Sequence, residues 1–242
     1  MQEIELLPSD GCGIINMDNE YIRNYKIEND CKVITIGIKS EDVDYRATDI
    51  EYTKKGTSFK VKIDGKNVRF TTSLLGEHNI MNILCGIALA KELNMTNKEI
   101  ANGVASIRQV QHRLEVKDIN GYTFIDNAFN SNPVGCKYAL DVLSMMDGKR
   151  IIVTPGLIDL GKEENEDNYE FGRYMKDRAD FVILVGEKNS EYVHKGALDG
   201  GIPEECILTV PSVREAFNYV YKNFSKKDTI LLENDLPDAF LH

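Results

Sequence analysis

The stretch GEHNIMN, residues 76–82, combines residue types that can bind a nucleobase or an anion. A helical hydrophobic pattern begins here, so the first backbone N–H groups lack partners within the helix. The carboxamides of Asn79 and Asn82 each offer a hydrogen-bond donor and an acceptor, as recognition of a purine requires. A purely structural alternative is that His78 and Asn79 cap the helix and bind nothing.

A second cluster, QHRLEV, places His112 and Arg113 close to the expected boundary between two domains. An Arg guanidinium can clamp a phosphate through two parallel hydrogen bonds or stack on a base. Small-molecule pockets gather at domain interfaces, which favours such a role. Alternatively, Arg113 is a surface residue that pairs with Glu115 or another nearby carboxylate.

The third cluster, FIDNAFNSNPVG, joins a strand to a helix that has Pro133 near its first turn. The strand ends in Asp126 and Asn127, and small polar residues follow them. Open parallel sheets present ligand contacts at the carboxyl ends of their strands, where Asp or Asn could hold a ribose hydroxyl. Functional residues concentrate on loops held by a rigid sheet, so we favour a binding role over a plain polar connection.

A fourth stretch, TPGLIDLGKE, has the spacing of a P-loop without its chemistry. Gly156, four residues, Gly161 and Lys162 are followed by Glu163, where a Walker A loop needs Ser or Thr to ligate magnesium. That carboxylate, together with Asp159, would place negative charge beside the phosphates. We therefore expect no phosphate-binding loop in this segment.

The elements that carry the first cluster are strands and turns followed by two helices. Apolar runs at GCGIINMD and KVITIGI indicate strands. Asp64 and Gly65 separate TSFKVKI from KNVRF and supply the positive φ angles of a two-residue hairpin turn. From Gly76 the period is helical, and a capping box at residues 96–99 opens a second helix. The first helix is expected to bury one face, made of Ile80, Ile83, Leu84, Ile87, Ala88 and Leu93.

From about Val110 strands alternate with helices. The expected strands are GYTFID, KRIIVTPG, FVILVG and DTILLEND, and the expected helices include VGCKYALDVLSMM and YEFGRYMKDRA. Ser212 and Glu215 form a second capping box before a helix that runs to Phe224. This alternation predicts an α/β fold with a doubly wound, mostly parallel, Rossmann-like sheet. The boundary is placed in GVASIRQVQHRLEV, giving two expected domains, residues 1–109 and 110–242.

Composition limits the classes of partner. A chain of 242 residues is long enough for two ordinary domains. Its 39 acidic and 29 basic residues give a net charge of -10, which argues against a nucleic-acid partner. Five scattered cysteines without a C-x-x-C pair indicate neither a disulfide framework nor a zinc site. No signal peptide or membrane span is visible, so a cytoplasmic location is expected.

Taken together and in this order, the three clusters resemble the Mur ligase family, the ATP-dependent enzymes that add amino acids to the peptide of the peptidoglycan precursor. GEHNIMN is similar to the family's G-x-H-N-x-x-N, QHRLE to its [GH]-R-x-E, and IDNAFNSNP to its I-D-D-x-[YF]-N-A-N-P. The last form is closest to the branch that adds D-alanyl-D-alanine. The resemblance covers essentially the whole chain and implies the end of the central ATPase domain followed by the entire C-terminal domain.

The resemblance implies ATP as the cofactor and assigns residues to it. Asn79 and Asn82 would contact the adenine, and His78 would lie near the nucleotide. Arg113 would reach toward ATP from the C-terminal domain. These assignments make the first two clusters parts of one nucleotide site.

The third cluster departs from the family at one position. Asn127 stands where the family usually has a second Asp that binds the ribose. An amide carries no charge and accepts weaker hydrogen bonds than a carboxylate, so ribose binding is in doubt at this position. Asp126 is retained and is the candidate to substitute in part.

The larger departure is what the sequence lacks. The family carries a UDP-substrate domain, a G-T-x-G-K-[ST] P-loop, Glu and His ligands for Mg²⁺, and a carbamylated lysine, and none of these is present. TPGLIDLGKE resembles instead a loop after the second strand of the C-terminal domain. Phosphoryl transfer depends on such a loop and its metal, so the chain alone is expected to be inactive, with no catalytic residue and no metal ligand of its own.

Three interpretations of the chain stay open. It is the C-terminal portion of a ligase that joins a UDP-muramoyl peptide to a D-amino acid or dipeptide through an acyl phosphate, a non-catalytic nucleotide-binding or regulatory module that partners a separate P-loop chain, or the product of gene fragmentation. A half sheet leaves an unpaired edge, so pairing with a missing N-terminal half or self-association is expected. The coding region upstream would distinguish the first two.

Overall fold

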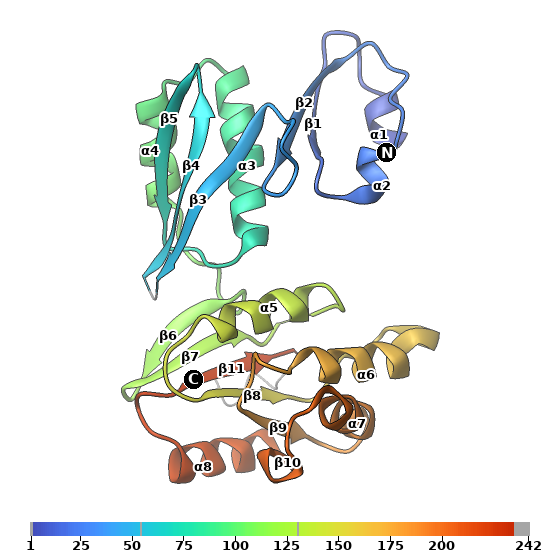
Figure 1. Cartoon of the computed structure of the whole chain (residues 1–242), viewed down its shortest axis with the longest axis vertical. Helices are drawn as coiled ribbons and strands as arrows, with labels where there is room; N and C mark the ends of the chain where they lie inside the picture. The colour runs from blue at the N-terminus through green and yellow to red at the C-terminus, as the bar shows by residue number, and fades with distance from the viewer. Residues whose placement is uncertain (1, 54, 130, 235–242) are drawn as a thin grey trace. The chain divides into compact units, whose positions relative to one another are not determined.

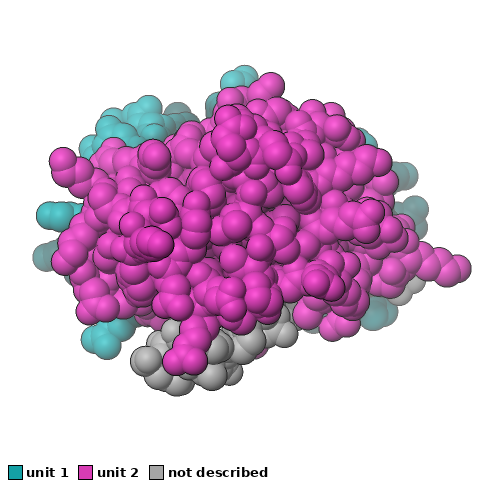
Figure 2. All heavy atoms as spheres, turned by 90° about the horizontal axis from the view of Figure 1, so that it is seen from below, with its two compact units in different colours: residues 1–108 teal, residues 109–242 magenta. Residues whose placement is uncertain are grey.

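The computed structural model of this chain describes residues 2–53, 55–129 and 131–234. It forms two compact units, residues 1–108 and 109–242, which Figure 2 colours teal and magenta. Each unit is built around one sheet, the first of five strands and the second of six. Asn130 of the third cluster and Asp235 of the expected last strand lie outside the described residues.

The first unit contains a mixed sheet in the order β1-β2-β3-β4-β5 (Figure 1). The pairs β1–β2 and β2–β3 are parallel, and the pairs β3–β4 and β4–β5 are antiparallel. The strands are β1 (Cys12–Asn16), β2 (Lys32–Gly37), β3 (Tyr45–Thr53), β4 (Gly56–Ile63) and β5 (Lys66–Thr72). Two four-residue helices, α1 (Gln2–Glu5) and α2 (Glu20–Arg23), lie beside β1, which is an edge strand.

The β4–β5 hairpin is the one that the sequence predicts. Asp64 and Gly65 form its two-residue turn with φ angles of 51° and 76°. Positive φ at both central residues gives the turn the twist of the flanking strands. Phe59 and Phe70 pair across the hairpin with ring centroids 5.6 Å apart and bury its inner face.

Two helices, α3 (Glu77–Glu92) and α4 (Asn97–Ser106), complete the core of this unit. The predicted capping box is confirmed, because Thr96 accepts from the Glu99 amide and the Glu99 carboxylate accepts from the Thr96 amide at 2.8 Å. The predicted inward face is buried except at Leu93, which is 67 % exposed. That part of the prediction is wrong because α3 ends at Glu92, and Leu93 belongs to the turn that follows.

The second unit contains a six-stranded sheet in the order β10-β9-β8-β11-β7-β6, in which only β6 is antiparallel to its neighbour. Helices cover both faces, with α5, α6 and α7 on one side and α8 on the other (Figure 1). The predicted doubly wound α/β fold is confirmed. Its strands are β6 (Glu115–Ile119), β7 (Tyr122–Asn127), β8 (Arg150–Thr154), β9 (Phe181–Val185), β10 (Ile207–Val210) and β11 (Thr229–Glu233). Its helices are α5 (Gly135–Ser144), α6 (Glu164–Tyr174), α7 (Ser190–Gly200) and α8 (Val213–Asn223), with short 3₁₀ turns at Gly161–Glu163 and Glu204–Cys206.

Several elements differ from the sequence-based expectation. The strands β3, β6 and β10 and the helix α7 are additional elements, since mixed polar and apolar residues weaken their periodicity. The acidic first turn of α6 starts that helix earlier than expected. Ser212 caps α8 through the Glu215 amide, whereas the reciprocal half of a capping box is not recorded among the described residues.

Two global features follow from these elements. Among the described helices, none has the length and apolar character needed to cross a bilayer. The five cysteines are free thiols, and only Cys31 and Cys136 are buried, whereas most of them were expected to be.

Candidate functional site

The start of α3 holds the first cluster. Gly76 precedes the helix with φ 92°, a conformation that favours glycine, and its carbonyl accepts from the Asn79 amide. The Asn79 side chain turns back and donates from Nδ2 to the Leu75 carbonyl at 2.8 Å. Its Oδ1 has no donor among the described residues, so one acceptor stays open at this helix start.

Asn82 lies one turn further along α3 and is exposed. Within residues 2–53, 55–129 and 131–234 its carboxamide makes no hydrogen bond, so both its donor and its acceptor face solvent. His78 is half-buried, and burial lowers the pKa of its imidazole. The imidazole is therefore neutral at pH 7 and does not act as a cation toward phosphate.

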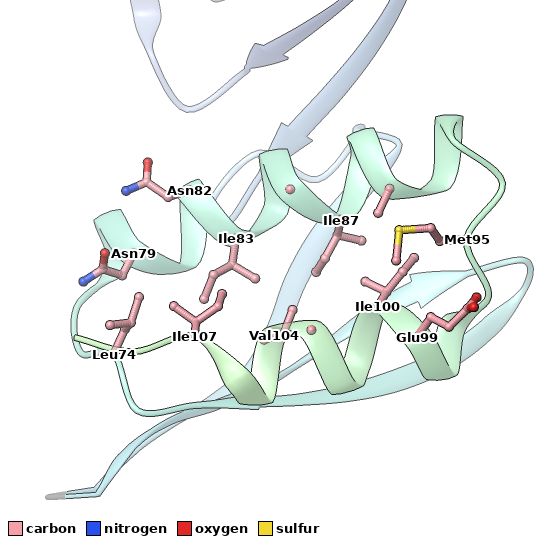
Figure 3. Close-up of a pocket in the computed structure, with 13 residues that line it drawn as sticks. Leu74, Asn79, Asn82, Ile83, Ile87, Met95, Glu99, Ile100, Val104 and Ile107 are labelled. Atoms are coloured by element: carbon pink, nitrogen blue, oxygen red, sulfur yellow. The ribbon is translucent and has the colours of Figure 1, made fainter. Parts of the chain in front are cut away.

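An apolar groove runs between α3 and α4 beside these asparagines. It encloses about 380 Å³, within the size range of small-molecule sites. Figure 3 shows Asn79 at one end of the groove and Glu99 at the other, while the Asn82 carboxamide points away from α4. Its walls are apolar side chains, chiefly Ile83, Ile87, Ile100, Val104 and Ile107.

Arg113 stands on a strained loop in the second unit. Its neighbours His112 and Leu114 have φ angles of 58° and 52°, in the left-handed region that non-glycine residues rarely adopt. Such strain persists only where surrounding contacts impose it. Here the Arg113 amide donates to the Val110 carbonyl and the His112 amide donates to the Glu115 carboxylate.

The Arg113 side chain is exposed and forms no ion pair within the part of the chain that the structure describes. Its guanidinium lies 4.4 Å from the centre of the Phe129 ring, and Phe129 is itself 54 % exposed. The alternative pairing with Glu115 is not observed, because Glu115 bridges to Lys117 at 3.0 Å. Arg113 is thus a cation placed over an aromatic ring, with donors available to a ligand.

Asp126, expected as a partial ribose ligand, is only 1 % exposed. Its Oδ2 accepts from Lys117 Nζ at 2.7 Å and lies 2.9 Å from His112 Nδ1, while Oδ1 accepts from the Ala128 amide. The carboxylate therefore ties β7 to the Arg113 loop and to β6. A ribose contact would have to displace one of these partners, so that assignment stays a prediction.

Asn127, at the end of β7, is also engaged within the protein. Its Oδ1 accepts from the Leu114 amide at 3.2 Å, and its Nδ2 donates to Glu233 Oε2 at 2.9 Å. Glu233 ends β11 and also accepts from Ser131 Oγ at 2.5 Å. The role of Asn127 at a ribose remains a prediction.

Glu233 is the residue of this edge that sequence reasoning missed. It is fully buried, and burial raises its pKa to about 7 despite the hydrogen bonds from Ser131 and Asn127. The signal was present in the sequence, since a carboxylate ends the apolar strand TILLE. Its partner lies 106 residues away, which no local pattern reveals.

The loop at residues 155–163 is built for structure and not for phosphate. The amides of Gly156, Leu157 and Leu160 donate to side chains of the same unit. A Cβ on Gly156 would lie 2.6 Å from Asn168 Oδ1 and 2.8 Å from Asn189 Cβ, so buried side chains fill the space beside the loop. The expectation that this segment is not a P-loop agrees with that arrangement.

The predicted site residues therefore fall into two groups. His78, Asn79 and Asn82 lie together at the start of α3 in the first unit. Arg113, Asp126 and Asn127 lie together around the end of β7 in the second unit. Among the described residues, no group of three or more His, Cys, Asp or Glu side chains is arranged to hold a metal ion.

Comparisons with known proteins match both units. A family model described as "Mur ligase middle domain" matches residues 3–90, and one described as "Mur ligase, glutamate ligase domain" matches residues 112–233. The chain is 27 % identical over 237 residues to a UDP-N-acetylmuramoyl-tripeptide--D-alanyl-D-alanine ligase of Bacillus subtilis, covering 96 % of this chain and 50 % of the relative. It is 29 % identical over 186 residues to the ligase of that name from Escherichia coli, covering 76 % of this chain and 41 % of the relative.

A solved structure shows the same fold. The structure of MurF ligase from Thermotoga maritima in complex with ADP superposes with a TM-score of 0.81 at 18 % identity, covering 96 % of this chain and 51 % of that one. The chain thus spans about half the length of the relatives it matches. One family model alone covers half of the chain and a second covers most of the remainder. On these grounds the chain belongs to the Mur ligase family.

Proposed function

We propose that this chain forms the adenosine-binding and closing part of a Mur-type ligase of peptidoglycan precursor synthesis, and that it needs a separate P-loop segment for phosphoryl transfer. The observation that carries the proposal is the pair of open carboxamides at the start of α3, beside an apolar groove and within the residues that match the family's middle domain. The reaction of the complete ligase would activate a UDP-muramoyl-peptide carboxylate as an acyl phosphate, which D-alanyl-D-alanine or another amine then displaces. No Walker A sequence occurs in the 242 residues.

The hydrogen-bonding capacity of the asparagines fits adenine. Asn79 donates to Leu75 and keeps an acceptor, which suits an exocyclic amino group. Asn82 keeps both a donor and an acceptor, which suits a ring nitrogen and its neighbouring N–H group. The apolar walls of the groove would cover the flat face of the base, and His78 would lie beside the nucleotide as a neutral imidazole.

Arg113 is the residue of the second unit that we assign to phosphate. Its exposed guanidinium has no carboxylate partner among the described residues and is held by a constrained loop. A preorganised cation costs little reorganisation when a phosphate arrives. We assign Arg113 to the phosphates of ATP, and Asp126 and Asn127 to the loop that presents it or to the ribose.

The partner would add to the open edge of β1. β1 pairs in parallel with β2 on one side and lies at the edge of the sheet. Parallel strands usually lie in sheets whose two faces are both covered. A groove of about 380 Å³ runs along β1, lined by apolar side chains that include Ile4, Leu7, Ile15 and Ile22. From α3, Cys85 also lines this groove. The occupant that fits is a parallel strand and helix of the P-loop segment, which corresponds to the unmatched half of the relatives.

Ligation and binding assays test the proposal together. The chain alone, mixed with ATP, Mg²⁺, UDP-muramoyl tripeptide and D-alanyl-D-alanine, should form no product by chromatography, while equilibrium dialysis with labelled ATP should show weak binding. Product above a boiled-protein control would overturn the need for a separate P-loop segment. No ATP binding at millimolar nucleotide, with folded protein, would overturn the adenosine assignment. Sedimentation that gives a concentration-dependent dimer would assign the β1 edge to a second copy instead.

A further inference from the structure

Asn127, Glu233 and their neighbours form one hydrogen-bonded chain across the carboxyl edge of the second sheet. β11 inserts between β7 and β8, and its register places Glu233 directly opposite Asn127. In this network of hydrogen bonds, the Leu114 amide donates to Asn127, Asn127 donates to Glu233, and Ser131 donates to Glu233. It thereby connects the Arg113 loop to the loop before α5.

This network excludes an ionised Asp at residue 127. Asn127 accepts from Leu114 and donates to Glu233 at the same time, which a carboxamide can do and a carboxylate cannot. An Asp at this position has no donor, and it would face the Glu233 carboxylate at hydrogen-bond distance. Two carboxylates so placed cannot both ionise without strong repulsion.

Within residues 2–53, 55–129 and 131–234, no cation pairs with Glu233. It is 0 % exposed, and β11 places it between β7 and β8. β7 presents Asn127, and the loop between β7 and α5 presents Ser131. β8 ends in Val153 and Thr154. α5 presents the Cys136 thiol, whose pKa is raised by burial and by Glu233. A second negative charge at residue 127 would therefore have no compensation within this cluster.

We propose that Glu233 and Asn127 act as a single positioning unit, in which the buried carboxylate at 233 takes the place of an acidic residue at 127 and holds the Arg113 loop. The unit acts on the nucleotide only through Arg113, and in that respect the inference rests on the proposed function. Neither residue is catalytic. An ionised Asp at 127 is excluded because the carboxylate stands one strand away.

An exchange of the two groups tests the inference. Asn127→Asp and Glu233→Gln are each made alone and then together. In the double variant the carboxylate at position 127 keeps an acceptor for the Leu114 amide, and the new amide at position 233 donates back to it, so charge and hydrogen bonds are both restored. At pH 8 Asn127→Asp should unfold at least about 5 °C below the wild type, and adding Glu233→Gln should bring the double variant back to within about 3 °C of it.

A matched control uses a buried asparagine without a carboxylate hydrogen-bond partner. Asn168 is 0 % exposed and bonds only to backbone groups, so Asn168→Asp combined with Glu233→Gln should show additive losses. The defect of Asn127→Asp should also shrink at pH 5, where the carboxylate pair shares a proton, while that of Glu233→Gln should not. A change in mere packing would not follow pH in this way.

The outcomes separate the inference from the proposed function. A double variant no more stable than the weaker single variant overturns the inference, and so does a pH-independent defect of Asn127→Asp. If Asn127→Asp does not fold at pH 8, its recovery as folded protein by Glu233→Gln is the readout, and failure of both is the contrary result. Labelled-ATP dialysis on the same proteins tests the nucleotide link: coupling in stability without any ATP binding keeps the positioning unit and removes the proposed function.

Discussion

The two units use the same residue type in opposite ways. At the start of α3, Asn82 is exposed and Asn79 keeps an unbonded acceptor. At the carboxyl edge of the second sheet, Asn127 and Asn234 direct their amides into the protein. A polar group that is already satisfied contributes to stability, whereas one left open at a groove is available to a ligand. Under the proposed function, the open asparagines are the ones that would contact a base, and the bonded ones hold a loop.

The hydrogen-bonded side chains of Asn127, Ser131, Glu233 and Asn234 form a closed cluster. The largest effect should come from breaking this cluster at Asn234. This side chain is 1 % exposed, accepts from the Ser131 amide and donates to the Gly156 carbonyl. Asn234→Ala leaves both groups buried without a partner, so the free energy of unfolding in urea should fall by about 2–4 kcal/mol. The matched control is Asn223→Ala on the surface of α8, expected within about 0.5 kcal/mol of wild type. Equal losses would mean that the cluster is not closed.

Glu233 should make the unfolding free energy depend on pH. Because burial raises its folded pKa to about 7, above the unfolded value, the folded state binds the proton more tightly. The stability from this group is complete at low pH and is lost as pH rises from about 4.5 through 7, by roughly 3 kcal/mol. The difference between wild type and Glu233→Gln, measured by urea unfolding across pH 4.5–8, should show that slope. A constant difference would place the ionisation elsewhere.

The open cluster consists of Asn79 and Asn82 at the start of α3. A substitution there should have the smallest effect on stability and a clear effect on binding. Asn82→Ala should leave the unfolding free energy within about 0.5 kcal/mol of wild type, since no hydrogen bond within the described residues is lost. Removing one base contact should weaken ATP binding about fivefold to tenfold by dialysis. Asn102→Ala, on the exposed side of α4, is the control that should change neither quantity. Unchanged affinity in Asn82→Ala would exclude this residue from the base contact.

Local chemistry explains which parts of the fold the sequence predicts. The Asp64 and Gly65 turn and the capping box at Thr96 are each specified by residues within a few positions, and both are confirmed. The prediction misplaces Leu93 because periodicity alone does not show where a helix stops. β3 mixes polar and apolar residues without a clear period and β10 has only four residues, so both depend on neighbouring strands for their pairing.

The candidate site shows the same division at longer range. The residue types at positions 79, 82, 113, 126 and 127 are visible in the sequence, but not which of them are already bonded. That difference depends on β11, which follows the other strands in the sequence but lies between β7 and β8 in the sheet. The pairing of Asn127 with Glu233 spans 106 residues, so only the folded sheet reveals it.

The stacking of Arg113 on Phe129 has a spectroscopic consequence. The sequence contains no tryptophan, so Phe129→Trp would introduce a sole indole beneath that guanidinium. A half-exposed aromatic position tolerates a larger ring, and indole emission responds to any movement of the cation above it. The second unit would then report the arrival of phosphate by fluorescence, without any label on the nucleotide.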